Sequence, residues 1–252
     1  MSHKITYYDT IEKELISLAN NYNSPLLHLK SLISVRQYRP LYEIFSRYVP
    51  KGSKVLDWGA GNGHFSYFLC RLEYQATGFS MEEFSFKNLV EDFGYKFIKG
   101  PVNKPSKLPF PTNLFDCAVS VGVLEHVREF GGTEIKSMKE IRRVLKPEGV
   151  FICCHLPNKY SLVEFLGGLF KDKFHHQWKF GEDDIKDLCK QSNLNLLEAG
   201  RYGILPRNSL SNLPFFRTSK IFAQIYDHLD KALSLLLNPV CQNYYFAARK
   251  SR

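Results

Sequence analysis

Three glycines and a carboxylate follow an apolar run in KVLDWGAGNGHF, residues 54–65. Asp57 comes two places before the first glycine, and Gly59, Gly61 and Gly63 then occupy alternate positions. Glycines let a backbone turn sharply and approach a ligand with no Cβ in the way. A helix that begins near Asn62 would add free N–H groups that favour an anionic group. This stretch therefore predicts a ligand-binding loop directly after a strand.

The residues of the loop are compatible with more than one kind of ligand. A dinucleotide loop needs a GxGxxG pattern, but His64 occupies the position of its third glycine. A phosphate-binding P-loop needs Lys followed by Ser or Thr, which is absent. A tight turn without a ligand and a loop for a different ligand both remain.

Several histidines could accept a proton near neutral pH, which an oxygen nucleophile usually requires. His126 lies in LEHV, His155 lies at the end of VFICCHL, and His175 and His176 form a pair in KFHHQWKF. We take His126, His155 and His176 as candidate catalytic bases, and a purely structural role is the alternative for each. No carboxylate spacing around them supports a metal site, so no metal is predicted.

Short apolar strands alternate with helices from residue 53 onward. The predicted strands span 54–58, 74–79, 95–100, 115–122 and 150–156, with helices over 64–72, 81–93 and 135–146. A helix over 181–193, a strand over 194–204, a helix over 219–237 and a strand over 244–250 follow. This order predicts an α/β fold with a Rossmann-like, doubly wound, mainly parallel seven-stranded sheet.

The chain begins with helical patterns over 10–22 and 36–49, and Pro50, Lys51 and Gly52 then interrupt it. We therefore divide it into a helical N-terminal cap, 1–50, and a domain, 51–252, with a late helical insertion at about 204–238. The helix over 219–237 carries Ile221, Ile225, Leu229 and Leu233 on one face, which we expect in the core. With Phe215 and Phe216, this helix could instead form a lid or a lipid-facing surface.

Three further segments accompany the glycine loop in a fixed order. They are LPFPTNLFD (108–116), VGVLEHV (121–127) and EIRRVLKPEGVFI (140–152). Together with VLDWGAGNG, they resemble the class I S-adenosylmethionine-dependent methyltransferases, especially the small-molecule group (methyltransferase type 11-like) that includes the ubiquinone-biosynthesis enzymes. The resemblance covers roughly residues 50–155. It implies S-adenosyl-L-methionine as cofactor and S-adenosyl-L-homocysteine as product.

The resemblance also implies cofactor-binding positions in this chain. They are Asp57, Gly59, Ala60, Gly61, Asn62, Ser80, Met81, Val121 and Gly122. Ser80 stands where the family usually has an acidic residue that holds the ribose hydroxyls, so Ser80 itself, Glu82 or Glu83 would take that role. Asn103 or Ser106 would replace the family's acidic residue near the adenine. His64, Arg36, Tyr38 and Arg39 are expected near the cofactor carboxylate or the substrate.

The net charge of +9 comes from Lys and Arg spread along the chain, without a basic run. The six cysteines form no CxxC pair, and we expect reduced, mostly buried thiols. The polar start and the absence of an apolar run of about 18 residues predict a cytoplasmic protein without a transmembrane segment, although contact with a membrane surface is left open.

These features together predict a methyltransferase that methylates an oxygen of a small molecule or a glycan precursor. An RNA or protein methyltransferase is one alternative, motivated by the positive charge. A non-catalytic protein that binds the cofactor or a partner is the other, motivated by Ser80. The sequence does not indicate the oligomeric state.

Overall fold

The computed structural model describes residues 2–21, 26–81, 93–101, 106–168, 176–208 and 218–252. The first half of the chain forms α1 (Ser2–Asn21), η1 (Leu27–Leu29), α2 (Leu32–Val35), η2 (Arg36–Tyr38), α3 (Arg39–Tyr48), β1 (Lys54–Trp58), α4 (His64–Arg71), β2 (Gln75–Ser80), β3 (Lys96–Lys99), β4 (Phe115–Val121) and η3 (Leu124–His126). The rest forms α6 (Glu134–Val144), β5 (Leu145–Pro157), α7 (Leu162–Gly167), α8 (Glu182–Gln191), β6 (Leu194–Tyr202), α10 (Lys220–Leu236), η5 (Asn238–Val240) and β7 (Asn243–Lys250).

The strands form one seven-stranded sheet in the order β3-β2-β1-β4-β5-β7-β6. Pairs from β3 to β5 are parallel, and β7 runs antiparallel to both β5 and β6. The order reverses between β1 and β4, where ligands bind in doubly wound sheets. The predicted fold class and all seven predicted strands are therefore confirmed.

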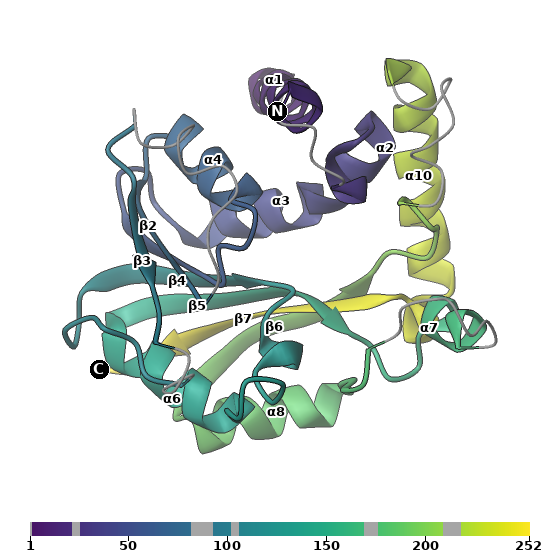
Figure 1. Ribbon diagram of the computed structural model, residues 1–252. Helices are drawn as coiled ribbons and strands as arrows, with labels where there is room; N and C mark the ends of the chain where they lie inside the picture. Colours follow the sequence, from purple (N-terminus) through teal and green to yellow (C-terminus); the bar gives the residue numbers. More distant parts are fainter. Residues whose placement is uncertain (1, 22–25, 82–92, 102–105, 169–175, 209–217) are drawn as a thin grey trace.

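Helices cover both faces of the sheet (Figure 1). One face packs through Val55, Cys117 and Ile152 against α1, α3 and α4. The other packs through Leu56, Ala118 and Phe151 against α6 and α8. Because both faces are buried, β4 is an almost continuous apolar run. All six cysteines are buried and none forms a disulfide, as predicted.

The N-terminal helices pack over the sheet on the side of α4, and α10 stands beside α2 (Figure 1). The helix predicted over 81–93 falls almost wholly on residues 82–92, which lie outside the described residues, so it stays a prediction. So does the division into a cap, a sheet domain and an insertion. None of the described helices is long and apolar enough to cross a membrane.

The predicted core face of α10 is wrong. Ile221, Ile225 and Leu229 are 73%, 58% and 50% exposed, and Leu233 is only partly buried. The helix instead buries a face made of Ala223, Tyr226, Asp230 and Ser234. Asp230 accepts the backbone N–H groups of Ile204 and Leu205, at 2.8 and 2.9 Å. Hydrogen bonds to the preceding loop, rather than apolar area alone, thus decide which side of α10 faces inward.

Candidate active site

The glycine loop links the end of β1 to the start of α4 and turns through left-handed backbone conformations. Gly59 has φ +79°, and its N–H donates to the Phe79 carbonyl at 2.7 Å, which ties the loop to β2. A Cβ on Gly59 would lie 2.3 Å from Val123 Cγ2. Glycine is therefore required here both for the turn and for the close approach of the segment after β4.

Asp57 lies inside the fold beneath this loop. It is 2% exposed and accepts a hydrogen bond from Ser66 Oγ at 2.5 Å, and Ser66 in turn contacts the Tyr95 hydroxyl at 2.7 Å. Burial raises the pKa of Asp57 to about 7, against the opposing hydrogen bonds from Ser66. In this conformation Asp57 fastens α4 to β1, and so organises the loop from below.

A cavity of about 270 Å³ opens at the carboxyl ends of β1, β2 and β4. Four of the predicted cofactor-binding residues line it: Gly59, Ser80, Met81 and Gly122. The others, Asp57, Ala60, Gly61, Asn62 and Val121, are not part of its wall. Sequence reasoning missed Trp58, Phe79, Val123 and Phe130, which supply its apolar surface. Their positions next to the motif residues were the only available indication.

The residues around this cavity fit S-adenosylmethionine. The loop leaves room for a ligand because Gly59 and Gly122 carry no Cβ, and both have positive φ. Trp58, Phe79 and Met81 offer an apolar wall to a planar base, and Ser80 offers a hydroxyl at the end of β2. Glu82, Glu83 and Asn103 lie outside the described residues. Ser106 lies against Gly132, and it is not part of the cavity wall.

The candidate catalytic histidines fall into two groups. His126 and His176 lie side by side, with ring centroids 5.8 Å apart. His126 lines the cofactor cavity beside Glu125, whose buried carboxyl has its pKa raised to about 8 by desolvation. His155 lies instead between Tyr38 and Tyr202, at centroid distances of 5.1 and 5.6 Å. His175 is outside the described residues.

His155 lies at an irregularity of β5. The register between β5 and β7 shifts between Cys153 and Leu156, and His155 has φ +58°. A β-bulge re-aims a side chain, and such conformations in residues other than glycine are strained. The His155 N–H donates to the Tyr202 hydroxyl at 2.9 Å, which holds this conformation in place.

Two more histidines join this group. His64 lies 4.3 Å from Tyr38 and 5.3 Å from His28, measured between ring centroids. Burial lowers the pKa of His28 and of His155 to about 4, and it also lowers that of His64 well below its ordinary value. All three are therefore neutral at pH 7. Within the described chain, both ring nitrogens of His64 and the Nε2 atoms of His28 and His155 have no hydrogen-bond partner.

A second cavity, of about 520 Å³, lies between the N-terminal helices, the ends of β6 and β7, and α10. His155 and Tyr202 form part of its wall, together with Arg36 and Arg39. His155 also lies close to the segment after β4, since a Cβ on Gly122 would be 3.8 Å from the His155 Cβ. His155 thus lies between the segment after β4 and a space large enough for a small molecule.

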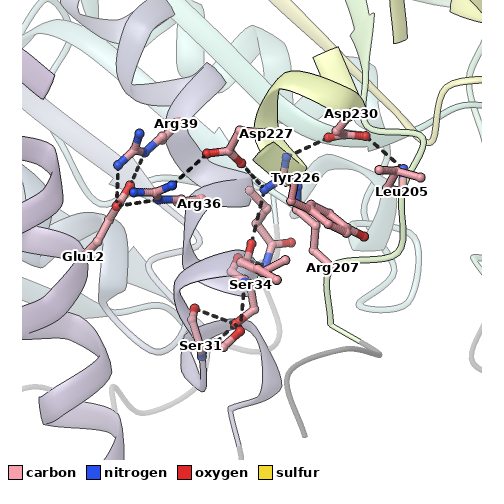
Figure 2. A network of polar contacts seen from close by, with 12 residues as sticks. Glu12, Ser31, Ser34, Arg36, Arg39, Leu205, Arg207, Tyr226, Asp227 and Asp230 are labelled. Atoms are coloured by element: carbon pink, nitrogen blue, oxygen red, sulfur yellow. Dashed lines mark hydrogen bonds and ion pairs between the residues drawn. The ribbon is translucent and has the colours of Figure 1, made fainter. Parts of the chain in front are cut away.

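Arg36 and Arg39, expected near the cofactor carboxylate, are paired with carboxylates of the protein (Figure 2). The Arg36 guanidinium is fully buried and contacts Asp9, Glu12 and Asp227 at 3.2–3.4 Å. Arg39 pairs with Glu12 at 2.5 Å and with Asp9. Their charges therefore join α1 and α10 to η2 and to the start of α3. Of the three residues predicted there, Tyr38 alone contacts the histidine group.

Comparisons with known proteins agree with this geometry. Residues 56–153, from β1 to the middle of β5, match the family model described as "Methyltransferase domain". This match supports the predicted resemblance to the class I S-adenosylmethionine-dependent methyltransferases over residues 56–153. The matched residues include the glycine loop and the segment after β4, which together bound the 270 Å³ cavity. No curated protein matches the chain significantly.

Solved structures share the fold at low sequence identity. A 1,6-didemethyltoxoflavin-N1-methyltransferase from Burkholderia thailandensis, solved with S-adenosylhomocysteine, has 18% identity and a TM-score of 0.57, over 97% of this chain and 89% of that one. A SAM-dependent methyltransferase from Aquifex aeolicus has 13% identity and a TM-score of 0.54, over 82% and 88%. The [4+2]-cyclase SpnF has 16% identity and a TM-score of 0.55, over 84% and 80%. At such identities the likeness concerns the fold alone.

Proposed function

We propose that this chain transfers a methyl group from S-adenosylmethionine to an oxygen atom of a small molecule or saccharide, with His155 as the general base. The observation that carries the proposal is the position of His155. Its Nε2 has no partner among the described residues, and its ring lies in the wall of the 520 Å³ cavity, next to the segment after β4.

The cofactor would supply a methyl group on a positively charged sulfur, which is already electrophilic. The protein then has to hold the acceptor oxygen in line with that group and to remove its proton. Burial keeps His155 neutral at pH 7, which leaves its lone pair available for that proton and also makes the ring a weaker base than free histidine. Tyr38 and Tyr202 pack against the ring and limit its rotation.

The size and wall of the cavity support a small acceptor. A volume of about 520 Å³ suits a metabolite or a short saccharide. Gln242 and Asn243 contribute amide groups to its wall, and amides pair well with the hydroxyl groups of a saccharide. Gln37 and Asn208, also in the wall, pair with each other at 3.1 Å. His126 instead lines the 270 Å³ cavity, and His176 lies beside it.

Two measurements test the proposal in order. Calorimetry with S-adenosylhomocysteine tests the cofactor, and absence of heat at millimolar ligand would refute the whole assignment. A methyl-transfer assay against hydroxylated metabolites and glycans, read by the mass gain of one methyl group, tests the acceptor. Products methylated only on nitrogen, or methylated RNA or protein alone, would refute the acceptor class while leaving the cofactor in place.

His155→Asn tests the base. Asn tolerates a positive φ better than most residues, so the strained backbone should persist. We expect unchanged S-adenosylhomocysteine affinity and a fall in kcat of roughly 10²–10⁴-fold, the usual contribution of a general base. Tyr202→Phe, which keeps the ring beside His155, serves as a milder variant. Unchanged kcat in His155→Asn would rule His155 out as the base.

A further inference from the structure

The fold gathers three side chains that suit a metal ion. Glu125 and His126 belong to η3, after β4, and His176 comes from the segment before α8. One potential ligand atom from each of the three lies within 4.8 Å of the other two. We propose that Glu125, His126 and His176 bind a divalent transition-metal ion.

The burial of Glu125 is the first argument. The residue is 2% exposed, and its Oε2 has no hydrogen-bond partner in the part of the chain that the structure describes. Its Oε1 lies 4.0 Å from His126 Nε2, too far for a hydrogen bond. A buried carboxylate oxygen without a partner is costly, and a bound cation would satisfy Oε2.

The orientation of the two imidazoles is the second argument. His126 Nδ1 lies 2.7 Å from Glu129 Oε1, and His176 Nδ1 lies 2.8 Å from Glu164 Oε1. A carboxylate on Nδ1 fixes the proton there and leaves the lone pair on Nε2, as in many metal-binding histidines. Both neighbouring histidines have a carboxylate at Nδ1, and this shared arrangement suits metal binding better than an isolated ion pair.

Glu164 is itself held firmly in position. Its Oε2 accepts the His176 backbone N–H at 3.1 Å and lies 3.2 Å from Lys179 Nζ. Glu164 belongs to α7, so a residue far from Glu125 and His126 in the sequence holds the third ligand, His176. The sequence predicted no metal because His176 and Glu164 approach Glu125 and His126 only in the folded chain.

The donor atoms indicate which ions fit. Two imidazole nitrogens and one carboxylate favour Zn²⁺, Fe²⁺ or Co²⁺ over Mg²⁺ and Ca²⁺. Three protein ligands would leave further coordination positions for water or another ligand. His126 lines the cofactor cavity, and a Cβ on Gly122 would be 3.6 Å from Glu125 Oε1. The ion would therefore lie beside the segment after β4 that borders the 270 Å³ cavity, whatever the methyl acceptor is.

The test measures metal binding directly, without reference to methyl transfer. The full chain without an affinity tag is stripped with a chelator and titrated with Zn²⁺ by calorimetry and with Co²⁺ by visible absorption. We expect one ion per chain, with cobalt bands typical of nitrogen and oxygen ligands. No binding at 100 µM metal would overturn the proposal, as would a thiolate-to-cobalt band, because that band would place the ion on cysteines.

Matched variants locate the site. Glu125→Gln and His176→Gln should each lower Zn²⁺ affinity at least 100-fold, and Glu164→Gln should lower it about 10–100-fold by releasing the His176 ring. His228→Gln, an exposed histidine on α10, should leave affinity unchanged. Since Glu125 is buried, thermal unfolding in metal-free buffer checks its fold, and the partly exposed His176 provides an independent answer. Unchanged affinity in His176→Gln would overturn the proposal.

Discussion

Gly59 is the single residue on which the cofactor loop depends most directly. It combines a left-handed backbone with a contact that leaves no space for a side chain. Gly59→Ala would force Val123 away from the loop and thereby alter the wall of the 270 Å³ cavity. We expect S-adenosylhomocysteine affinity, measured by calorimetry, to fall at least tenfold.

Gly52→Ala is the matched control for this prediction. Gly52 has φ +78°, nearly the same conformation, but a Cβ there would meet nothing within 4 Å. It should pay only the backbone penalty, about 1 kcal/mol of unfolding free energy, and retain cofactor affinity. Equal affinity in both variants would show that the packing of Gly59 on Val123 does not shape the ligand site.

Single residues also show which parts of the site could be predicted from the sequence. The glycine pattern located the loop because a tight turn after a strand requires glycines that are close together in the sequence. The contacts of His155 with Tyr38 and Tyr202 have no such sequence pattern, because they join β5, η2 and β6 through tertiary packing. The contact between His126 and His176 likewise exists only in the folded chain.

At the scale of elements, a buried ionic network joins α1, η2 and α10 (Figure 2). Glu12 is fully buried between Arg36 and Arg39, so Glu12→Gln would leave two guanidinium groups short of a charge partner. Breaking such a buried pair costs about 3–5 kcal/mol. We expect Glu12→Gln to lower the free energy of unfolding, measured with urea, by about 3 kcal/mol or more.

Glu14→Gln makes the same change two positions along α1. Glu14 pairs with Arg71 at 2.8 Å, but both side chains are about 30% exposed. Solvent screens this pair, so the loss should be about 0–1 kcal/mol. If both variants were destabilised equally, the network around Arg36 would add nothing beyond a surface ion pair.

The elements also show why periodicity located α10 but misassigned its buried face. Apolar spacing predicted a helix over 219–237, close to the observed Lys220–Leu236. The buried side includes Asp230, which contacts Arg207 at 2.8 Å as well as the loop at Ile204. Periodicity measures apolar residues alone, so a face fixed partly by polar contacts is invisible to it.

At the scale of the whole molecule, the partly buried histidines His28 and His155 make folding depend on pH. Free histidine has a pKa of about 6.5, whereas burial holds that of His28 and His155 at about 4. The unfolded chain therefore binds more protons than the folded chain between these values. The contribution of these two histidines to stability is therefore fully present above pH 6.5 and is lost as the pH drops toward 4.

His28→Phe isolates one part of this dependence, because Phe keeps an aromatic ring beside Tyr38 and His64 and cannot be protonated. Between pH 7.5 and pH 5, we expect His28 to lower the unfolding free energy of the parent chain, measured with urea, by about 1–2 kcal/mol, while the raised pKa values of Asp57 and Glu125 act in the opposite direction. His28→Phe should lose correspondingly less over that interval. His228→Asn, on the exposed side of α10, should follow the parent. The same pH dependence in His28→Phe and the parent would mean that His28 is not buried in its neutral form.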